Sequence, residues 1–137
     1  MTPETDTEST DKKTKILLVE DNYMNQVLVT EILTLNGYDI VDAKTGTEAI
    51  KVFNEERPAL VLMDLHLPGM DGVTATRIIK ADSANKDIPI LALTASGMEG
   101  EEDSILSKGF DGYVSKPIEV QKLLNAISEG LGKGASD

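Results

Sequence analysis

Polar side chains that could bind a metal ion and a phosphate follow four apolar segments of this chain. The segments and the residues after them are Ile16–Val19 with Glu20 and Asp21, Ala59–Met63 with Asp64, Ile90–Leu93 with Thr94, and Gly112–Ser115 with Lys116. If these segments are parallel strands, their carboxyl ends lie along one edge of a sheet, where ligands of α/β proteins bind. Three carboxylates, a hydroxyl and an ammonium would then meet at one place. Such a group could hold a divalent cation and a phosphate.

Asp64 is the candidate for covalent chemistry. It lies between an apolar segment and the turn sequence Leu67–Gly72, so its carboxylate should remain accessible at the end of a strand. A carboxylate can attack phosphorus and form an acyl phosphate when cations offset the repulsion between the two anions. Mg²⁺ held by Glu20, Asp21 and Asp64 would provide part of this positive charge, and the Lys116 ammonium would add to it.

Each of these residues also has a purely structural explanation. Asp64 alone could initiate a turn, and Asp21 or Asn22 could cap the helix that follows. Thr94 could be an ordinary β-branched strand residue, and Lys116 could be a surface lysine before a helix that begins with proline. Because all of them follow apolar segments, their grouping favours the chemical interpretation, and a helix cap is compatible with it.

Strand-like and helix-like segments alternate along the chain, which predicts a doubly wound α/β fold. The predicted strands are 15–20, 38–42, 59–63, 89–94 and 111–115, and the predicted helices are 23–36, 46–56, 72–82, 97–108 and 118–130. The first helix should bury a face made of Met24, Val27, Leu28, Ile32 and Leu35. The helix at 97–108 has few apolar residues and flanking glycines, so it should be the least stable element.

Composition limits the classes of function. A length of 137 residues suits one domain, and the net charge of −11 disfavours nucleic acid and anionic membranes as partners. Cysteine is absent, which excludes a disulfide framework, a thiol nucleophile and a cysteine metal site. The chain shows no signal peptide and no apolar run near the roughly 20 residues of a membrane span. We therefore expect a soluble, cytoplasmic protein.

The two ends of the chain differ from the rest. Residues 1–13 are rich in Thr, Glu, Asp and Ser and have no apolar periodicity, which predicts a disordered tail. Residues 131–137 are expected to form a flexible C-terminal tail. The single domain should therefore span residues 14–130.

Four motifs taken together resemble the receiver domain of bacterial response regulators. They are Ile16–Asn22, Leu62–Gly72, Leu93–Ala95 and Ser115–Pro117, and the intervals that separate them also match that family. The chain is similar in particular to single-domain regulators and to the receivers of hybrid histidine kinases. The resemblance covers about residues 14–130. It implies a flavodoxin-like, five-stranded parallel sheet in the order 2-1-3-4-5 with five helices.

The resemblance implies which residues hold the phosphoryl group and the metal. Asp64 would be the phosphoacceptor, and Glu20 and Asp21 would be the acidic pair that serves Mg²⁺, with Mn²⁺ as an alternative metal. The backbone carbonyl of His66 would be a further metal ligand. No organic cofactor is implied.

The resemblance also implies residues that respond to the phosphoryl group. Lys116 would contact the phosphate, and Thr94 and Tyr113 would be the switch residues. The small Ala95 would leave space for the phosphoryl group. Lys116 and Pro117 would be joined by a cis peptide bond, which is uncommon even before proline.

Two positions depart from the common pattern of the family. Glu20 stands where many members have aspartate, and its extra methylene group would let it bind the metal through water. His66 is an unusual residue two positions after the phosphoacceptor. It is either an exposed loop residue without a role or an imidazole that modulates hydrolysis of the acyl phosphate.

The function implied is that of a switch in a two-component or phosphorelay system. Asp64 would take a phosphoryl group from a histidine kinase or a histidine phosphotransfer protein, and the modified domain would then bind a downstream protein. The protein would be a monomer without an output domain. It would not be an enzyme, although it would assist its own phosphorylation and dephosphorylation.

The same residues bear on four alternative functions. A phosphorylation-independent interaction module of the same fold should have lost Asp64, Lys116 or an acidic partner, and none is lost. A pure phosphate carrier in a relay would keep all of them. A metal-dependent phosphatase would need aspartate where His66 stands. A flavin-binding domain would need a phosphate-binding loop where Glu20 and Asp21 stand.

Overall fold

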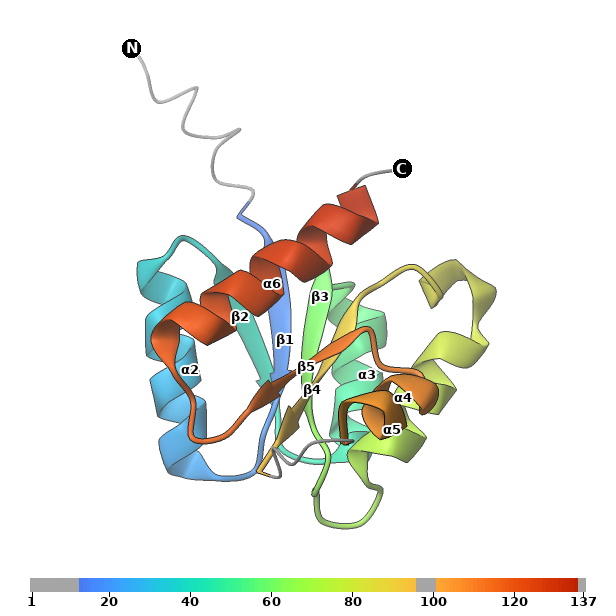
Figure 1. Ribbon diagram of the computed structural model, residues 1–137. Coiled ribbons are helices and arrows are strands. Elements are labelled where there is room, and N and C mark those ends of the chain that lie inside the picture. Colours follow the sequence, from blue (N-terminus) through green and yellow to red (C-terminus); the bar gives the residue numbers. More distant parts are fainter. Residues whose placement is uncertain (1–12, 96–100, 136–137) are drawn as a thin grey trace.

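The computed structural model describes residues 13–95 and 101–135, which form a five-stranded parallel sheet covered by helices (Figure 1). The strand order is β2-β1-β3-β4-β5, which confirms the predicted flavodoxin-like, doubly wound topology. The strands are β1 (Lys15–Val19), β2 (Asp39–Ala43), β3 (Leu60–Asp64), β4 (Ile90–Thr94) and β5 (Gly112–Ser115). The helices are α2 (Tyr23–Leu35), α3 (Gly46–Glu56), α4 (Gly72–Ala81), the 3-10 helix η1 (Ser83–Asn85), α5 (Glu101–Ser107) and α6 (Val120–Ala135). Within the described residues, no helix is both long enough and apolar enough for a membrane span.

The sheet separates two hydrophobic cores. Helices α2 and α6 pack on one face, and α3, α4 and α5 pack on the other (Figure 1). Alternate residues of each strand enter opposite cores, so Leu17 joins Phe53 on one side while Leu18 joins Leu33 on the other. The central strands β1, β3 and β4 are apolar almost throughout because both of their faces are buried. Each of these strands therefore ends where its run of buried apolar residues ends.

The predicted buried face of α2 is wrong for most of its residues. Met24 and Leu35 are 71% and 79% exposed, and Val27 and Leu28 are exposed as well. The helix instead buries Gln26, Val29, Ile32 and Leu33. Apolar residues occur around most of this helix, so their periodicity alone could not select a face. The buried amide of Gln26 donates a hydrogen bond to the Asp42 carboxylate on β2, which satisfies this polar side chain within the fold.

The last helix is longer than predicted. It continues to Ala135, so the predicted helix end at residue 130 is wrong by five residues. Gly130 does not end the helix. A Cβ atom there would lie 3.1 Å from Leu60 Cδ1, so glycine lets α6 approach the sheet closely. Leu131 then packs against the core beneath it.

Two further predictions about the chain fall partly outside the described residues. The start of the predicted 97–108 helix lies outside them, and α5 is described only from Glu101. The predicted tail at 1–13 lies outside them except for Lys13. The short helix η1 was not predicted.

Three helices begin at the carboxyl edge of the sheet with a side-chain cap. The side chains of Asn22, Thr45 and Asp71 accept backbone N–H hydrogen bonds at the starts of α2, α3 and α4. Asn22, rather than Asp21, is therefore the cap of the first helix. Capping satisfies N–H groups that have no partner within the helix. It also places the positive ends of three helix dipoles along this edge.

Replacing Asp71 with alanine should lower the free energy of unfolding by about 1 kcal/mol at neutral pH, because the α4 cap is lost. Hydrogen bonds from the backbone and side chain of Thr74 lower the pKa of Asp71 below 3.8. A lowered folded-state pKa adds stability above the unfolded-state pKa, and this stability is lost as pH falls through the folded-state value. The difference between the wild type and Asp71→Ala should therefore shrink below pH 3.8. Urea unfolding at neutral pH and below this value measures it.

Asp71→Asn is the matched control, since asparagine keeps the accepting oxygen and removes the charge. This variant should remain close to the wild type at neutral pH. A loss for Asp71→Ala that is equal at both pH values would show that the carboxylate charge contributes nothing to the cap.

Candidate functional site

Three carboxylates meet where β1 and β3 end. Glu20 and Asp21 follow β1, and Asp64 is the last residue of β3, its neighbour in the sheet. Carboxylate oxygens of the three residues all lie within 4.8 Å of one another. Because β1 and β3 are parallel and in register, their ends place these groups side by side without any loop to position them.

Lys116 follows the last strand, β5, and brings a positive charge to these carboxylates. Its Nζ atom lies 3.0 Å from Glu20 Oε1 and 3.1 Å from Asp64 Oδ2. Its backbone N–H donates to the carbonyl of Thr94 at 2.8 Å, which holds the residue at the end of β4. The peptide bond to Pro117 is cis, as predicted. Lys116 thus reaches across β4 to the two acids.

Two of the carboxylates are almost completely removed from water. Glu20 is 1% exposed and Asp64 is 4% exposed, while Asp21 is exposed. Burial raises the pKa of Glu20, and the charge of Asp64 acts in the same direction. The ion pair with Lys116 and the hydrogen bond from the Asn22 N–H oppose this rise in the Glu20 pKa. Burial outweighs these two partners, so the pKa of Glu20 is raised on balance.

The same contacts decide the charge of Lys116. Desolvation by itself lowers the pKa of Lys116, but its close contacts with Glu20 and Asp64 and the charges of these two acids outweigh it. The net effect raises the pKa of Lys116 above 10.5. The ammonium is therefore protonated at neutral pH and acts as a fixed cation beside Asp64.

The acidic group fits a magnesium ion. Glu20 Oε1 is buried and close to Lys116 Nζ, yet among the described residues no donor is aligned to hydrogen-bond it. The contact is an ion pair by distance and not a hydrogen bond. Glu20 Oε1 can therefore still bind a further partner. All three side chains offer carboxylate oxygens, which Mg²⁺ prefers, and the exposed Asp21 leaves room for the water ligands that this ion usually retains.

The loop after β3 is built around Asp64. Asp64 Oδ1 accepts the backbone N–H of His66 at 3.0 Å, and the His66 side chain is exposed. Gly72 begins α4 directly against the end of β3. A Cβ atom at this position would lie 2.1 Å from the Asp64 carbonyl oxygen, so only glycine fits. The sequence interpretation placed Gly72 in a turn and missed this contact, because the sequence carries no signal of it.

The two predicted switch residues lie in different places. Thr94 is buried at the end of β4 on the same edge as the carboxylates, where it pairs in register with Ser115. Tyr113 is exposed on β5 and lines a hollow between that strand and the neighbouring helices. The structure therefore brings Glu20, Asp21, Asp64 and Lys116 together, with Thr94 on the same edge, and places Tyr113 apart from them.

Similar proteins include response regulators of bacterial polar differentiation. The polar-differentiation response regulator DivK of Brucella anthropi is 37% identical over 117 residues, which cover 85% of this chain and 95% of that protein. The match therefore spans nearly all of that protein and most of this chain.

Solved structures have the same fold. The receiver domain of a sensor histidine kinase from Pseudomonas aeruginosa, solved with a magnesium ion coordinated in the active site cleft, has a TM-score of 0.80 at 34% identity. The match covers 88% of this chain and 98% of that one. The chemotaxis response regulator CheY4 of Vibrio cholerae has a TM-score of 0.81 at 25% identity, over 87% of this chain and 99% of that one.

The comparison with protein families covers most of the chain. The model of the response regulator receiver domain matches residues 16–128, a span that contains the five strands except for Lys15, the first residue of β1, and every residue of the acidic group. The chain belongs to the response regulator receiver domain family of two-component signalling systems.

Proposed function

We propose that this receiver domain is a phosphorylation-dependent switch in which Asp64 accepts the phosphoryl group with the help of Mg²⁺. The observation that carries the proposal is the contact of Lys116 Nζ with both Asp64 and Glu20, beside the third carboxylate of Asp21. A structural ion pair needs only one acid for each lysine. Three acids around one lysine leave negative charge that a divalent cation would neutralise.

Each residue has a place in the transfer reaction. A carboxylate oxygen of Asp64 would form a bond to phosphorus as the bond from phosphorus to the donor's imidazole nitrogen breaks, and the imidazole leaves. Mg²⁺ bound by Glu20, Asp21, Asp64 and the His66 carbonyl, or Mn²⁺ in its place, would offset the charge of the phosphoryl oxygens. Lys116 already lies 3.1 Å from Asp64 Oδ2 and would contact a phosphoryl oxygen after transfer.

The same residues would assist removal of the phosphoryl group by water. In this proposal the domain takes part in its own phosphorylation and dephosphorylation and does not turn over a separate substrate. A cytoplasmic location and a monomeric state, both expected from the sequence, remain part of the proposal.

The exposed start of α2 supports a protein as the phosphoryl donor. Tyr23 and Met24 follow the acidic pair after the single residue Asn22, and both are among the most exposed large hydrophobic residues described. An apolar surface beside the phosphoacceptor suits a docking protein better than a small solute. The donor would be a histidine kinase or a histidine phosphotransfer protein.

Signalling to a downstream protein would use Thr94 and Tyr113. Thr94 lies on the carboxylate edge, and its hydroxyl would contact the phosphoryl oxygens once Asp64 is modified. This movement would free space for Tyr113 and alter the surface made by α5, β5 and α6. New contacts of Thr94 and Lys116 with the phosphoryl group supply the free-energy difference that such a change requires.

A small phosphodonor such as acetyl phosphate should label the wild-type protein only when Mg²⁺ is present. Asp64→Asn should abolish labelling because the amide oxygen is a far weaker nucleophile. Intact-mass analysis measures the added phosphoryl group. Asp71→Asn, an equal change in a nearby capping residue, should still be labelled. Robust labelling of Asp64→Asn would refute the assignment of the phosphoacceptor.

Mg²⁺ should stabilise the folded wild-type protein, by about 2.7 kcal/mol at a free concentration one hundred times its dissociation constant. Asp21→Asn should be more stable than the wild type without metal, because it removes one of the crowded negative charges. The variant should lose most of the stabilisation by Mg²⁺. Urea unfolding with Mg²⁺ and with EDTA measures both effects.

Glu55→Gln is the control for this experiment, since Glu55 is an exposed acid near the end of α3 that is distant from the strand ends. It changes the net charge equally and should leave the response to Mg²⁺ intact. An undiminished response in Asp21→Asn would remove Asp21 from the metal site.

Beryllofluoride with Mg²⁺, which mimics the phosphoryl group, should shift the amide resonances of β5 and slow hydrogen exchange in α5. Both elements belong to the surface that Thr94 and Tyr113 would alter. Two-dimensional NMR and exchange mass spectrometry measure these effects, with Asp64→Asn as the control that should not respond. Shifts confined to the neighbours of Asp64, with α5 unaltered, would instead indicate a phosphate carrier in a relay.

A further inference from the structure

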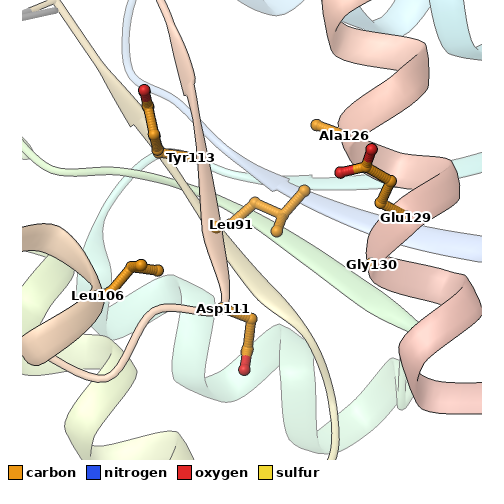
Figure 2. A pocket seen from close by; sticks show the side chains of 8 residues that line it. Leu91, Leu106, Asp111, Tyr113, Ala126, Glu129 and Gly130 are labelled. Atoms are coloured by element: carbon orange, nitrogen blue, oxygen red, sulfur yellow. The ribbon is translucent and has the colours of Figure 1, made fainter. Parts of the chain in front are cut away.

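A hollow of about 250 Å³ lies across the outer edge of the sheet, between α5, β5 and α6 (Figure 2). Its apolar lining comes from Leu91, Leu106, Ala126 and the ring of Tyr113. In Figure 2 the Leu91 side chain lies between the strands and α6, while Leu106 approaches from α5. β5 is the last strand of the described sheet, so the hollow opens on an edge that no other strand covers.

Two glycines create this hollow. A Cβ atom on Gly112 would lie 3.1 Å from Leu91 Cδ2, and one on Gly130 would lie 3.7 Å from the same atom. Without side chains at these positions, β5 and α6 come close to Leu91, which forms the floor. Any larger residue at either position would occupy the space beside Leu91.

The two acids of the lining differ in their partners. Asp111 Oδ2 accepts hydrogen bonds from Lys80 Nζ at 2.6 Å and from the Ile90 N–H at 2.8 Å, so this carboxylate is used by the fold. Glu129 is exposed and has no hydrogen bond or ion pair with any described side chain. Figure 2 shows its carboxylate extending from α6 near Ala126. An acid with no described partner therefore stands beside a hollow that apolar side chains line in part.

We propose that this hollow receives one basic side chain, of arginine or lysine, from a partner protein. Its aliphatic part would lie against Leu91 and Leu106, and its cationic end would pair with Glu129. Long basic side chains bury their methylene groups along apolar surface while the charged end stays in a polar environment. The carboxylate of Asp111 has no role in this proposal, because it already has partners within the fold.

Size and charge both favour this occupant. The volume lies below the roughly 300–1,000 Å³ of pockets that hold drug-sized molecules, so a single side chain fits better than a metabolite. The net charge of −11 favours the approach of a basic partner. This inference names the chemistry of a partner for the proposed switch. It is nevertheless tested on unmodified protein, so its failure and a failure of Asp64 to accept phosphate are separate results.

NMR titration with N-acetyl-arginine amide tests the proposal, because this probe carries the side chain without a partner protein. Saturable shifts should appear at the amides of Gly112, Tyr113 and Gly130, with a dissociation constant in the millimolar range expected of so small a ligand. N-acetyl-citrulline amide has nearly the same shape without the charge and should bind more weakly. Equal shifts with both probes would overturn the proposal.

Variants of Glu129 separate charge from shape. Glu129→Gln should fold normally, since the side chain is exposed, and should weaken binding of the arginine probe by about fivefold. Glu129→Lys should abolish binding, whereas the distant Glu55→Gln should bind as the wild type does. Unchanged binding in Glu129→Lys would overturn the proposal. So would shifts of the same amides on concentrating the protein alone, because a second copy of this chain would then occupy the hollow.

Discussion

The pairing of one lysine with two buried carboxylates is the constraint around which this structure is arranged. Glu20 and Asp64 end neighbouring strands almost out of contact with water, where like charges repel strongly. Lys116 offsets that repulsion through contacts of 3.0 Å and 3.1 Å. With Asp21 included, three acids face one ammonium, so the ion pairs stabilise the fold without neutralising the site. The remaining negative charge is what suits the edge to a divalent cation.

The rest of the fold delivers these groups to one place. Apolar strands buried on both faces fix the positions at which β1 and β3 end, and the parallel register sets their ends side by side. The backbone N–H of Lys116 donates a hydrogen bond to the Thr94 carbonyl. The end of β4 therefore helps to position Lys116, which follows β5. Gly72 lets α4 start against the Asp64 carbonyl, and capped helix starts leave their dipoles at the same edge.

The sequence predicted the features that depend on local pattern. Apolar runs predicted every strand to within about a residue, and the polar residues after those runs predicted that Glu20, Asp21, Asp64 and Lys116 would meet. Features that depend on distant contacts were not predictable in this way. The buried face of α2 depends on which side the sheet covers, because apolar residues surround that helix. Gly130 is a residue type that often ends a helix, but here it lets α6 pack closely against Leu60.

The contacts of β5 have a mechanical consequence. At its start, Asp111 exchanges hydrogen bonds with Ile90 through its N–H and its carboxylate, and it also holds Lys80 of α4. At its end, Lys116 is tied to Thr94 and to two acids. A strand anchored at both ends resists sliding, so a disturbance at one anchor is relieved by twisting the residues between them. Those residues include Tyr113 on the open edge, and a small tilt of the backbone there would swing its ring through a wide arc.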